Sequence, residues 1–450
     1  MNMKRLISLS FIICHLSFSE AQPLTLQQCM QYAVAHNHEV KRSELELDNF
    51  RASRRGALGR VLPEVDAGIG AQYNFGRAID PETNGYTDVS TFYNGYSVSG
   101  SLPVFDGFSR LHALKAAQAG VLMGHAALRR QQDQTALNVL QAFTSVAYQE
   151  GLVRMAGEKV AETALLLRQT RVLEEVGRKS AADVAQVESQ QAEADYELTR
   201  QQNLLASALL ELKKEMAFPL ADSINLDIAA LTARDSHRGT DSVPRWDRFS
   251  PTVGLERSHG GTFPELLAAQ YQMQASKHEW HQARASLYPS LSLGAGLSTT
   301  YYHTLHTPSA ASFSSQFRNN MGEYVGATLT IPLFNRLQTL TSMRRAKNNY
   351  RMACEAYEQK LLELEKLSCE AWQDWHGCQK QAAQLAKKVE ADSLAYQLTR
   401  RQFEEGLSTA IDLHTTSAQL LQSRAALLQC RLMVMVKEQL VRYYNGEQIW

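Results

Sequence analysis

Proline is missing from two long parts of the sequence, and neither sign of charge is in excess. The 450 residues carry 46 basic and 46 acidic side chains, a balance that gives no electrostatic footprint for nucleic-acid binding. Only 11 residues are proline, and none of these lies in 104–218 or in 333–450. Because proline interrupts helices, both stretches are free to form long uninterrupted helices.

Cysteine is scarce and unpatterned. Besides Cys14 near the N-terminus, the sequence holds an odd set without Cys-x-x-Cys spacing: Cys29, Cys354, Cys369, Cys378 and Cys430. Neither a disulfide framework nor a zinc site is indicated, and we expect free buried thiols. His278 and His281 lie one turn apart on an expected helix, without an accompanying carboxylate or cysteine pattern. We expect a surface pair there and no metal site.

Motifs that carry chemistry are also missing. The sequence has no nucleophile elbow, phosphate-binding loop or His-Glu-x-x-His motif, so we find no catalytic residue and no cofactor-binding residue. The sequence therefore predicts no enzyme and no cofactor.

Long hydrophobic runs are absent beyond the first residues. Lys4 and Arg5 precede the apolar run 6–18, and small residues around Ala21 offer a cleavage position; residues 1–21 are therefore predicted to be a secretory signal peptide. Cys14 follows Ile12-Ile13, where small residues would precede a lipidated cysteine, so we do not expect lipidation. Elsewhere no stretch approaches the ~20 apolar residues of a membrane-spanning helix. If this exported chain enters a membrane, strands must carry it.

The two proline-free stretches are rich in strong helix formers, namely Ala, Leu, Gln, Glu, Lys and Arg. We predict long helices over about 107–217 and 335–445. Apolar or small residues recur there at alternating spacings of four and three, as in Ala136, Leu140, Phe143 and Ala147. This spacing indicates coiled-coil packing.

Four short segments alternate with a period of two instead. They cover about 64–76, 93–103, 290–299 and 323–332, and each sets apolar residues against Ser, Thr, Gly, Asn or Gln. Alternation predicts strands. A soluble two-sided sheet would give the same pattern, but a transmembrane barrel with lipid outside and water inside fits better, because the expected long helices offer no second layer for the apolar face.

The order of these elements occurs twice. Leu102-Pro103-Val104-Phe105-Asp106 corresponds to Ile331-Pro332-Leu333-Phe334-Asn335, an offset of 229 positions, and Gly177 and Asp183 recur as Gly406 and Asp412 at the same offset. We therefore predict a first structural repeat at 22–218 and a second at 262–450. The stretch 219–261, rich in Pro, Gly, Asp and Ser, is predicted to be an irregular linker.

Several of these motifs are similar to those of one family. They are Leu24-Thr25-Leu26 opening a helix, Phe263-Pro264-Glu265-Leu266 opening the second repeat, Tyr288-Pro289-Ser290-Leu291 entering a strand, and the two acidic-glycine turns that run from Glu175 to Asp183 and from Glu404 to Asp412. From about residue 24 to residue 446 the sequence resembles the TolC-like outer membrane factor family, also called outer membrane efflux proteins.

The resemblance implies a mainly α fold with transmembrane β. Three subunits, each giving four strands, would form a 12-stranded outer-membrane β-barrel that is continued by a periplasmic α-helical coiled-coil barrel. Physics supplies part of this, because four strands cannot close a barrel and open edges are forbidden in lipid; a dimer would give eight strands and a trimer twelve. The resemblance implies the homotrimer. One helix over 108–176 would span roughly 100 Å at ~1.5 Å per residue.

The implied function is that of the outer-membrane exit duct of a tripartite efflux pump or a type I secretion system, located in the cell outer membrane with its helical part in the periplasm. The implied partners are a periplasmic adaptor protein, an inner-membrane RND or ABC transporter and outer-membrane lipid, with no nucleic acid. A periplasmic adaptor, a coiled-coil structural protein and a membrane-embedded hydrolase are alternatives. An adaptor would carry compact soluble β domains and usually one hairpin, and a hydrolase would need an active site that this sequence does not offer.

Two glycines mark the turns between paired helices. Gly177 and Gly406 each end a long helix, so a left-handed C-terminal cap accounts for both. The resemblance adds that these turns are periplasmic tips that contact the adaptor, through Val176, Gly177, Arg178, Glu405, Gly406 and Leu407.

Two aspartates follow the glycines. Ser180-Ala181-Ala182-Asp183 and Thr409-Ala410-Ile411-Asp412 both have the form of a capping box at a helix start. The resemblance adds that Asp412 matches an acidic residue lining the pore aperture, where a ring of carboxylates would favour cations, and Asp183 is a candidate for the same lining. A further family aspartate is Thr415 here, which makes the aperture less acidic. Capping alone, and capping together with pore lining, both remain open.

Overall fold

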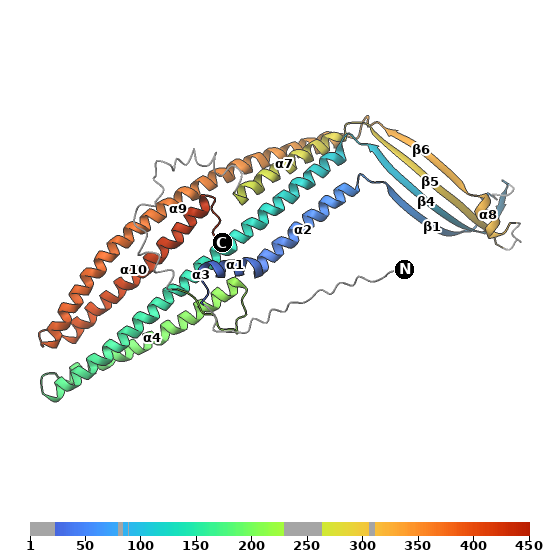
Figure 1. Cartoon of the computed structure of the whole chain (residues 1–450). Coiled ribbons are helices and arrows are strands. Elements are labelled where there is room, and N and C mark those ends of the chain that lie inside the picture. Colours follow the sequence, from blue (N-terminus) through green and yellow to red (C-terminus); the bar gives the residue numbers. More distant parts are fainter. Residues whose placement is uncertain (1–22, 80–83, 89, 229–262, 306–310) are drawn as a thin grey trace, which may run out of the picture. The chain divides into compact units, whose positions relative to one another are not determined.

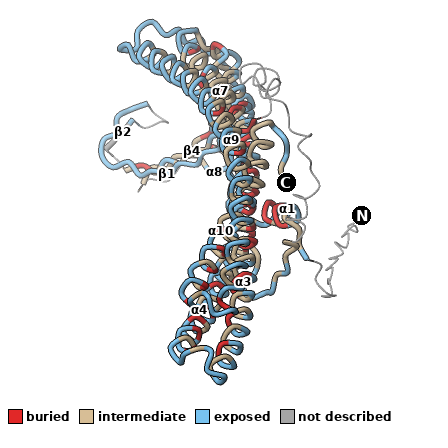
Figure 2. Tube along the Cα trace, turned by 90° about the vertical axis from the view of Figure 1, so that its left-hand side faces the viewer, coloured by how far each residue is buried: buried red, intermediate tan, exposed pale blue. Residues whose placement is uncertain are grey.

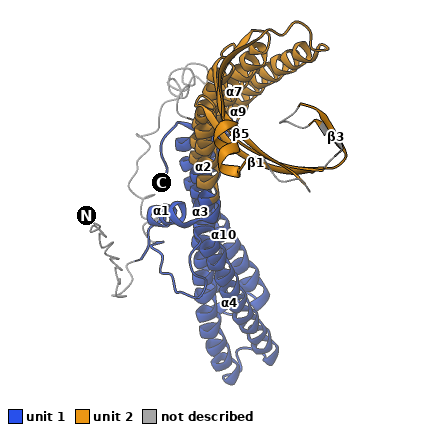
Figure 3. Cartoon of the chain, turned by 90° about the vertical axis from the view of Figure 1, so that its right-hand side faces the viewer, with its two compact units in different colours: residues 1–41, 131–258, 367–450 blue, residues 42–130, 259–366 orange. Residues whose placement is uncertain are grey.

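The computed structural model describes residues 23–79, 84–88, 90–228, 263–305 and 311–450. The expected signal peptide with Cys14 and most of the expected linker, residues 229–261, lie outside the described residues. The chain divides into two compact units, drawn in separate colours in Figure 3. Unit 1 comprises residues 1–41, 131–258 and 367–450, and unit 2 comprises residues 42–130 and 259–366.

The described part of the chain is mainly helical (Figure 1). Its longest helices are α3 Ser109–Glu175 and α9 Gln338–Glu404, each of 67 residues, or about 100 Å at ~1.5 Å per residue. Further helices are the short α1 Leu26–His36 and the longer α2 His38–Gly59, α4 Ala181–Met216, α7 Pro264–Ala285 and α10 Ala410–Tyr444. None of the helices in the described ranges is both long enough and apolar enough to cross a membrane.

Unit 2 contains a four-stranded antiparallel sheet in the order β1-β4-β5-β6. Its strands are β1 Glu64–Asn74, β4 Thr91–Phe105, β5 Ser290–Thr304 and β6 Gly322–Thr330. The central strands β4 and β5 extend beyond the segments expected from alternation, because they pair with each other along almost their whole length. Two short strands, β2 Arg77–Ile79 and β3 Tyr86–Asp88, form a separate pair.

The apolar faces of the four strands lie on one side of the sheet. Residues directly opposite each other in an antiparallel pair share a face, and one row across the sheet consists of Val65, Gly100, Ala295 and Val325. The intervening rows carry mainly Gly, Ser and Thr, together with Tyr93, Tyr302 and Tyr324. Figure 2 shows that β1 is largely exposed, and β6 is exposed throughout.

A short helix that the sequence analysis did not predict, α8 Phe313–Asn319, completes the edge of β5. β6 pairs only with residues 290–298 of β5, so the end of β5 extends past it. There the buried Gln316 amide donates to the Tyr302 carbonyl at 3.1 Å and accepts from the Tyr302 N–H at 3.0 Å. Asn320 donates to the Thr300 carbonyl at 2.8 Å. Side-chain amides therefore take the place of strand pairing at this edge.

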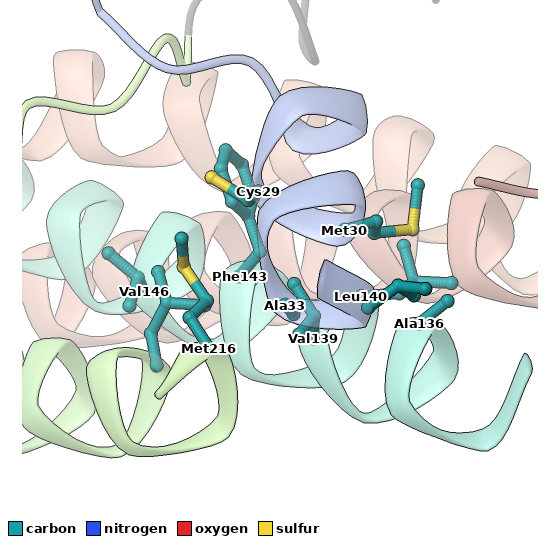
Figure 4. Close-up of a cluster of buried hydrophobic side chains, with 11 residues drawn as sticks. Cys29, Met30, Ala33, Ala136, Val139, Leu140, Phe143, Val146 and Met216 are labelled. Carbon is teal, nitrogen blue, oxygen red and sulfur yellow. The ribbon is translucent and has the colours of Figure 1, made fainter. Parts of the chain in front are cut away.

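The largest core of unit 1 lies where α1 crosses α3 and the end of α4 (Figure 4). Cys29, Met30 and Ala33 of α1 pack against Leu140 and Phe143 of α3 in this cluster. Thr25 starts α1 with a capping box completed by Gln28. The C-terminal end joins the same cluster, because the Trp450 indole donates to the Asp133 carboxylate at 2.8 Å.

The expectation of free buried thiols holds in full only for Cys29. Burial raises the pKa of the Cys29 thiol to about 12, so this side chain packs as a neutral apolar group. The other described cysteines are free as well, but they are half-buried because they lie at the sides of the long helices: Cys354, Cys369, Cys378 and Cys430.

Candidate functional site: the helical tips

The turn between α3 and α4 is a Schellman motif. Gly177 has φ +73°, and its N–H donates to the Glu174 carbonyl at 2.8 Å. The Arg178 N–H donates to the Leu173 carbonyl at 2.8 Å. These two bonds satisfy carbonyls that the end of a helix leaves without partners. The predicted left-handed glycine cap is therefore confirmed at this turn.

The turn between α9 and α10 repeats this geometry. Gly406 has φ +80°, its N–H donates to the Phe403 carbonyl at 3.1 Å, and the Leu407 N–H donates to the Gln402 carbonyl at 2.7 Å. Apart from the two chain neighbours, no described residue has a heavy atom within 4 Å of the position that a Cβ would occupy at Gly177 or at Gly406. Glycine is thus favoured at both turns by backbone conformation and not by lack of space.

Both aspartates cap the helices that follow. The Asp183 carboxylate accepts from the Ser180 N–H at 3.0 Å and from the Ser180 hydroxyl at 2.8 Å, and the Asp183 N–H donates back to that hydroxyl oxygen at 3.2 Å. The Asp412 carboxylate accepts from the Thr409 N–H at 3.1 Å and from its hydroxyl at 2.6 Å, and the Asp412 N–H donates back at 3.1 Å. The predicted capping boxes are therefore confirmed.

Capping also stabilises the charged form of these two carboxylates. The N–H of Ser180, and then its hydroxyl, lower the pKa of Asp183 by hydrogen bonding. For Asp412 the Thr409 hydroxyl has the larger effect, followed by the Thr409 N–H. Hydrogen bonds to the charged form favour ionisation, so both residues are anionic at neutral pH. Thr415 lies one turn beyond Asp412 on the exposed side of α10 and donates its hydroxyl to the Ile411 carbonyl.

A small core ties the two helical hairpins together just behind the turns. Its buried residues come from α4, α9 and α10: Val187, Phe403, Ala410 and Leu413. The Lys179 ammonium lies 3.9 Å from the centre of the Phe403 ring, a cation–π distance. The buried Gln190 amide donates to the Ala410 carbonyl at 3.2 Å. Sequence reasoning missed Lys179, Gln190 and Phe403, because each acts on a residue that lies far away in the chain.

The turns themselves present apolar side chains to solvent. Val176 is 63% exposed and Leu407 is 75% exposed, and the neighbouring residues Arg178 and Glu405 are exposed as well. The structure thus brings three tip residues together at each turn. It places Asp183 and Asp412 at the first turn of two different helices, each held by its own capping residue.

His278 and His281 do not form the expected surface pair. They are half-buried, and His112 of α3 joins them. The Nδ1 atoms of His112 and His278 lie 3.3 Å apart, and the His112 and His281 rings stack at 5.1 Å. Among the described residues, no group of three or more His, Cys, Asp or Glu side chains is arranged to hold a metal ion. Only the tertiary structure brings His112 to this cluster, so sequence spacing could not reveal it.

The model of the outer membrane efflux protein family matches residues 29–217 and 262–444, which together form most of the chain. The chain belongs to the outer membrane efflux protein family. Membership places the protein in the outer membrane, in a family of channels and not of enzymes. It decides against the alternatives of a periplasmic adaptor and a coiled-coil structural protein.

Individual relatives agree with this assignment. The pyoverdine export outer membrane protein OpmQ of Pseudomonas aeruginosa is 24% identical over 417 residues, which cover 90% of this efflux protein and 82% of the relative. The outer membrane protein TolC of Escherichia coli is 24% identical over 365 residues, covering 79% and 69%.

Solved structures show the same fold. The efflux protein is similar to CusC, with a TM-score of 0.77, 16% identity and coverage of 94% of this chain and 92% of the other. It is also similar to the outer membrane protein VceC of Vibrio cholerae, with a TM-score of 0.75, 14% identity and coverage of 94% and 97%. The fold class predicted from the sequence, mainly α with a small β part of outer membrane channel type, is confirmed.

Proposed function

We propose that this efflux protein is the exit duct of a tripartite efflux pump or a type I secretion system, and that it passively conducts substrates from an inner-membrane pump to the outside. The observation that carries the proposal is the sheet of unit 2, in which four strands direct all their apolar faces to one side. Such a sheet suits lipid on one face and water on the other. Relatives named for pyoverdine export and for toluene efflux support a transport role.

The duct closes as a homotrimer. In the order β1-β4-β5-β6, one edge of β1 and one edge of β6 have no strand partner within the sheet, and unpaired backbone groups are not tolerated in hydrocarbon. Pairing these edges between three copies gives a 12-stranded barrel, and outer-membrane lipid surrounds its apolar face. Helices of about 100 Å continue the duct into the periplasm.

The helical tips are the surface for the periplasmic adaptor. The exposed apolar side chains that the adaptor would cover are Val176 at the first turn and Leu407 at the second. Gly177, Arg178, Glu405 and Gly406 complete this surface. The adaptor connects the duct to an inner-membrane transporter of the RND or ABC class, which supplies the energy.

The first turns of α4 and α10 line the aperture of the duct. Asp183 is half-buried and Asp412 is exposed, and the capping hydrogen bonds lower the pKa of both carboxylates and so favour their charged form. In a trimer each would form a ring of three, and such rings favour cations. Thr415 contributes a neutral hydroxyl to the same lining.

Replacing Gly177 or Gly406 with valine tests the tip assignment. The space around each Cβ position is open, so the change strains only a left-handed turn, at a cost of order 1 kcal/mol. We expect normal trimer in the outer membrane, with loss of adaptor co-purification and of dye efflux.

Gly157→Val and Gly377→Val are matched controls. Both glycines lie inside the long helices, and among the described residues no atom beyond the local helix backbone lies within 4 Å of either Cβ position. These variants should retain adaptor binding and efflux. Adaptor binding and efflux at the normal level in both tip variants would show that the turns are not the docking surface.

A further inference from the structure

The two strand hairpins repeat one register. Pro63 and Pro289 precede β1 and β5 at corresponding positions, 226 residues apart, and Pro103 and Pro332 correspond at 229. Shifting the β1–β4 pair Glu64 and Ser101 by these offsets gives Ser290 and Thr330. The structure pairs those two residues in β5–β6. The repeats are therefore equivalent residue by residue within the sheet.

This equivalence indicates how the edges of β1 and β6 that have no strand partner in the sheet would pair with another copy. Between the hairpins, β4 pairs with β5, and Gly100 stands opposite Ala295. The counterpart of β4 is β6, and the counterpart of β5 is β1. In a closed ring of copies, an equivalent contact would pair β6 of one copy with β1 of the next as β4 pairs with β5 within the chain.

Resting on the trimeric duct proposed above, the strand registers point to a defined seam between copies. We infer that β6 pairs antiparallel with β1 of a second copy so that Leu329 stands opposite Ile69 of the partner subunit. The same register sets Ala327 opposite Ala71 of the partner subunit. The register follows from the pair Gly100 and Ala295, because adding 229 to the first position gives Leu329 and subtracting 226 from the second gives Ile69.

The apolar faces of β6 and β1 are consistent with this register. Leu329 and Ala327 lie on the apolar face of β6, because they pair with Leu291 and Leu293 of β5. Ile69 lies on the same face of β1, since it pairs with Tyr96. A slip of one residue would place apolar side chains opposite Gly, Ser and Thr positions.

The exposed fractions of the residues at the C-terminal end of β4 and just after β6 are also consistent with this register. Phe105 is 39% exposed and pairs with Leu291 of β5, whereas its counterpart Phe334 is 79% exposed. Likewise Leu333 is 93% exposed and its counterpart Val104 is 54% exposed. The second-repeat residues lack the neighbour that covers the first, and the partner subunit's β1 would supply this neighbour.

The equivalence of the two repeats does not extend to the turns that follow β4 and β6. A Cβ at Gly107 would lie 2.6 Å from the Ala285 carbonyl oxygen and 2.9 Å from the Tyr288 Cβ. Its counterpart Arg336 has the same left-handed conformation, with φ 55°, yet carries a Cβ. The copies must therefore stand further apart at this turn than α7 stands from Gly107, and the inferred register applies to the strands alone.

Disulfide cross-linking in whole cells tests the register. Thr328 and Gly70 both lie on the polar face and should be directly opposite across the seam. Opposed residues have Cα atoms about 4.5–5.5 Å apart, within the range for a disulfide. Within one chain β1 and β6 are not neighbours, so a disulfide in the Thr328→Cys, Gly70→Cys double variant joins two copies. Copper-phenanthroline oxidation should give dimer and trimer bands on a denaturing, non-reducing gel.

Register-shifted pairs are the matched controls. Thr328→Cys with Gln72→Cys, and Thr328→Cys with Gly68→Cys, keep the same face but move the partner by two residues, to about 7–8 Å. The single variants report any cross-linking through the native cysteines. We expect several-fold more cross-linking for the Gly70 pair than for either shifted pair.

The outcomes distinguish a wrong strand register from a wrong proposal of the trimeric duct. If amine-reactive cross-linking shows a trimer but a shifted pair gives the strongest disulfide band, the register is wrong and the trimeric duct stands. If the protein is a monomer by the same reagent, both the register and the duct are wrong.

Discussion

At the residue scale, the cluster of His112, His278 and His281 responds to pH. Burial, followed by neighbouring charges, lowers the pKa of each ring below the ordinary value of 6.5. The charges that face the cluster are Lys115 on α3, and Lys277 and Arg284 on α7. All are cationic, so protonation adds like charge to like charge. The folded protein therefore favours three neutral rings.

This cluster predicts acid sensitivity in unit 2. Because the pKa values are lowered on folding, the unfolded chain binds more protons below about pH 6.5, and stability decreases as the pH falls through this range. Amide exchange of α7 should be faster at about pH 5.5 than at pH 7.5 after correction for intrinsic rates. His112→Gln should reduce that difference, while His125→Gln, an exposed position on α3 outside the cluster, should not. An equal pH effect in both variants would contradict the assignment.

At the element scale, α8 shows how an exposed strand edge is satisfied without another strand. Gln316 and Asn320 bond the backbone of Tyr302 and Thr300, and the Thr299 hydroxyl donates to the Phe317 carbonyl at 2.7 Å. Phe317 also packs edge-on against Tyr96 at 5.4 Å. The helix is therefore attached to both central strands.

Removing the Gln316 amide should loosen this edge. Gln316→Ala deletes one hydrogen bond to each backbone group of Tyr302, and buried groups that lose a partner cost about 1–3 kcal/mol. We expect faster amide exchange at the end of β5, with the paired part of β5 unchanged. Asn319→Ala is the control, since Asn319 bonds Ser315 within the same helix. Unchanged exchange in Gln316→Ala would show that the amide does not hold the edge.

At the scale of the whole molecule, the sheet and the long helices face different solvents. The sheet directs its apolar residues to one side with no second layer over most of β1 and β6, whereas the helices bury theirs between α1, α3 and α4 or behind the tips. The first arrangement suits a bilayer and the second suits water.

Charge placed on the apolar face should therefore block assembly. Ile69→Arg and Leu293→Arg should cost about 2–4 kcal/mol each at the bilayer midplane, while Gln72→Arg on the polar face should be mild. Trimer yield in outer-membrane fractions is the measurement, with equal expression of the three variants checked before fractionation. Equal loss of trimer in all three would refute the assignment of the faces.

The sequence by itself determined the features that depend on neighbours along the chain. Proline-free stretches became α3, α4, α9 and α10, and period-two segments became strands, because propensity and alternation act over a few residues. The caps at Asp183 and Asp412 and the left-handed glycines were predictable for the same reason, since each bond spans three to five positions.

Only the tertiary structure decided which distant residues meet. The pairing of β4 with β5 joins residues about two hundred positions apart, and no local pattern specifies it. The same holds for His112 beside His278, for Gln190 on the Ala410 carbonyl and for Gln316 on Tyr302. Local energies select helices, strands and caps, but long-range contacts depend on which surfaces remain to be covered once those elements exist.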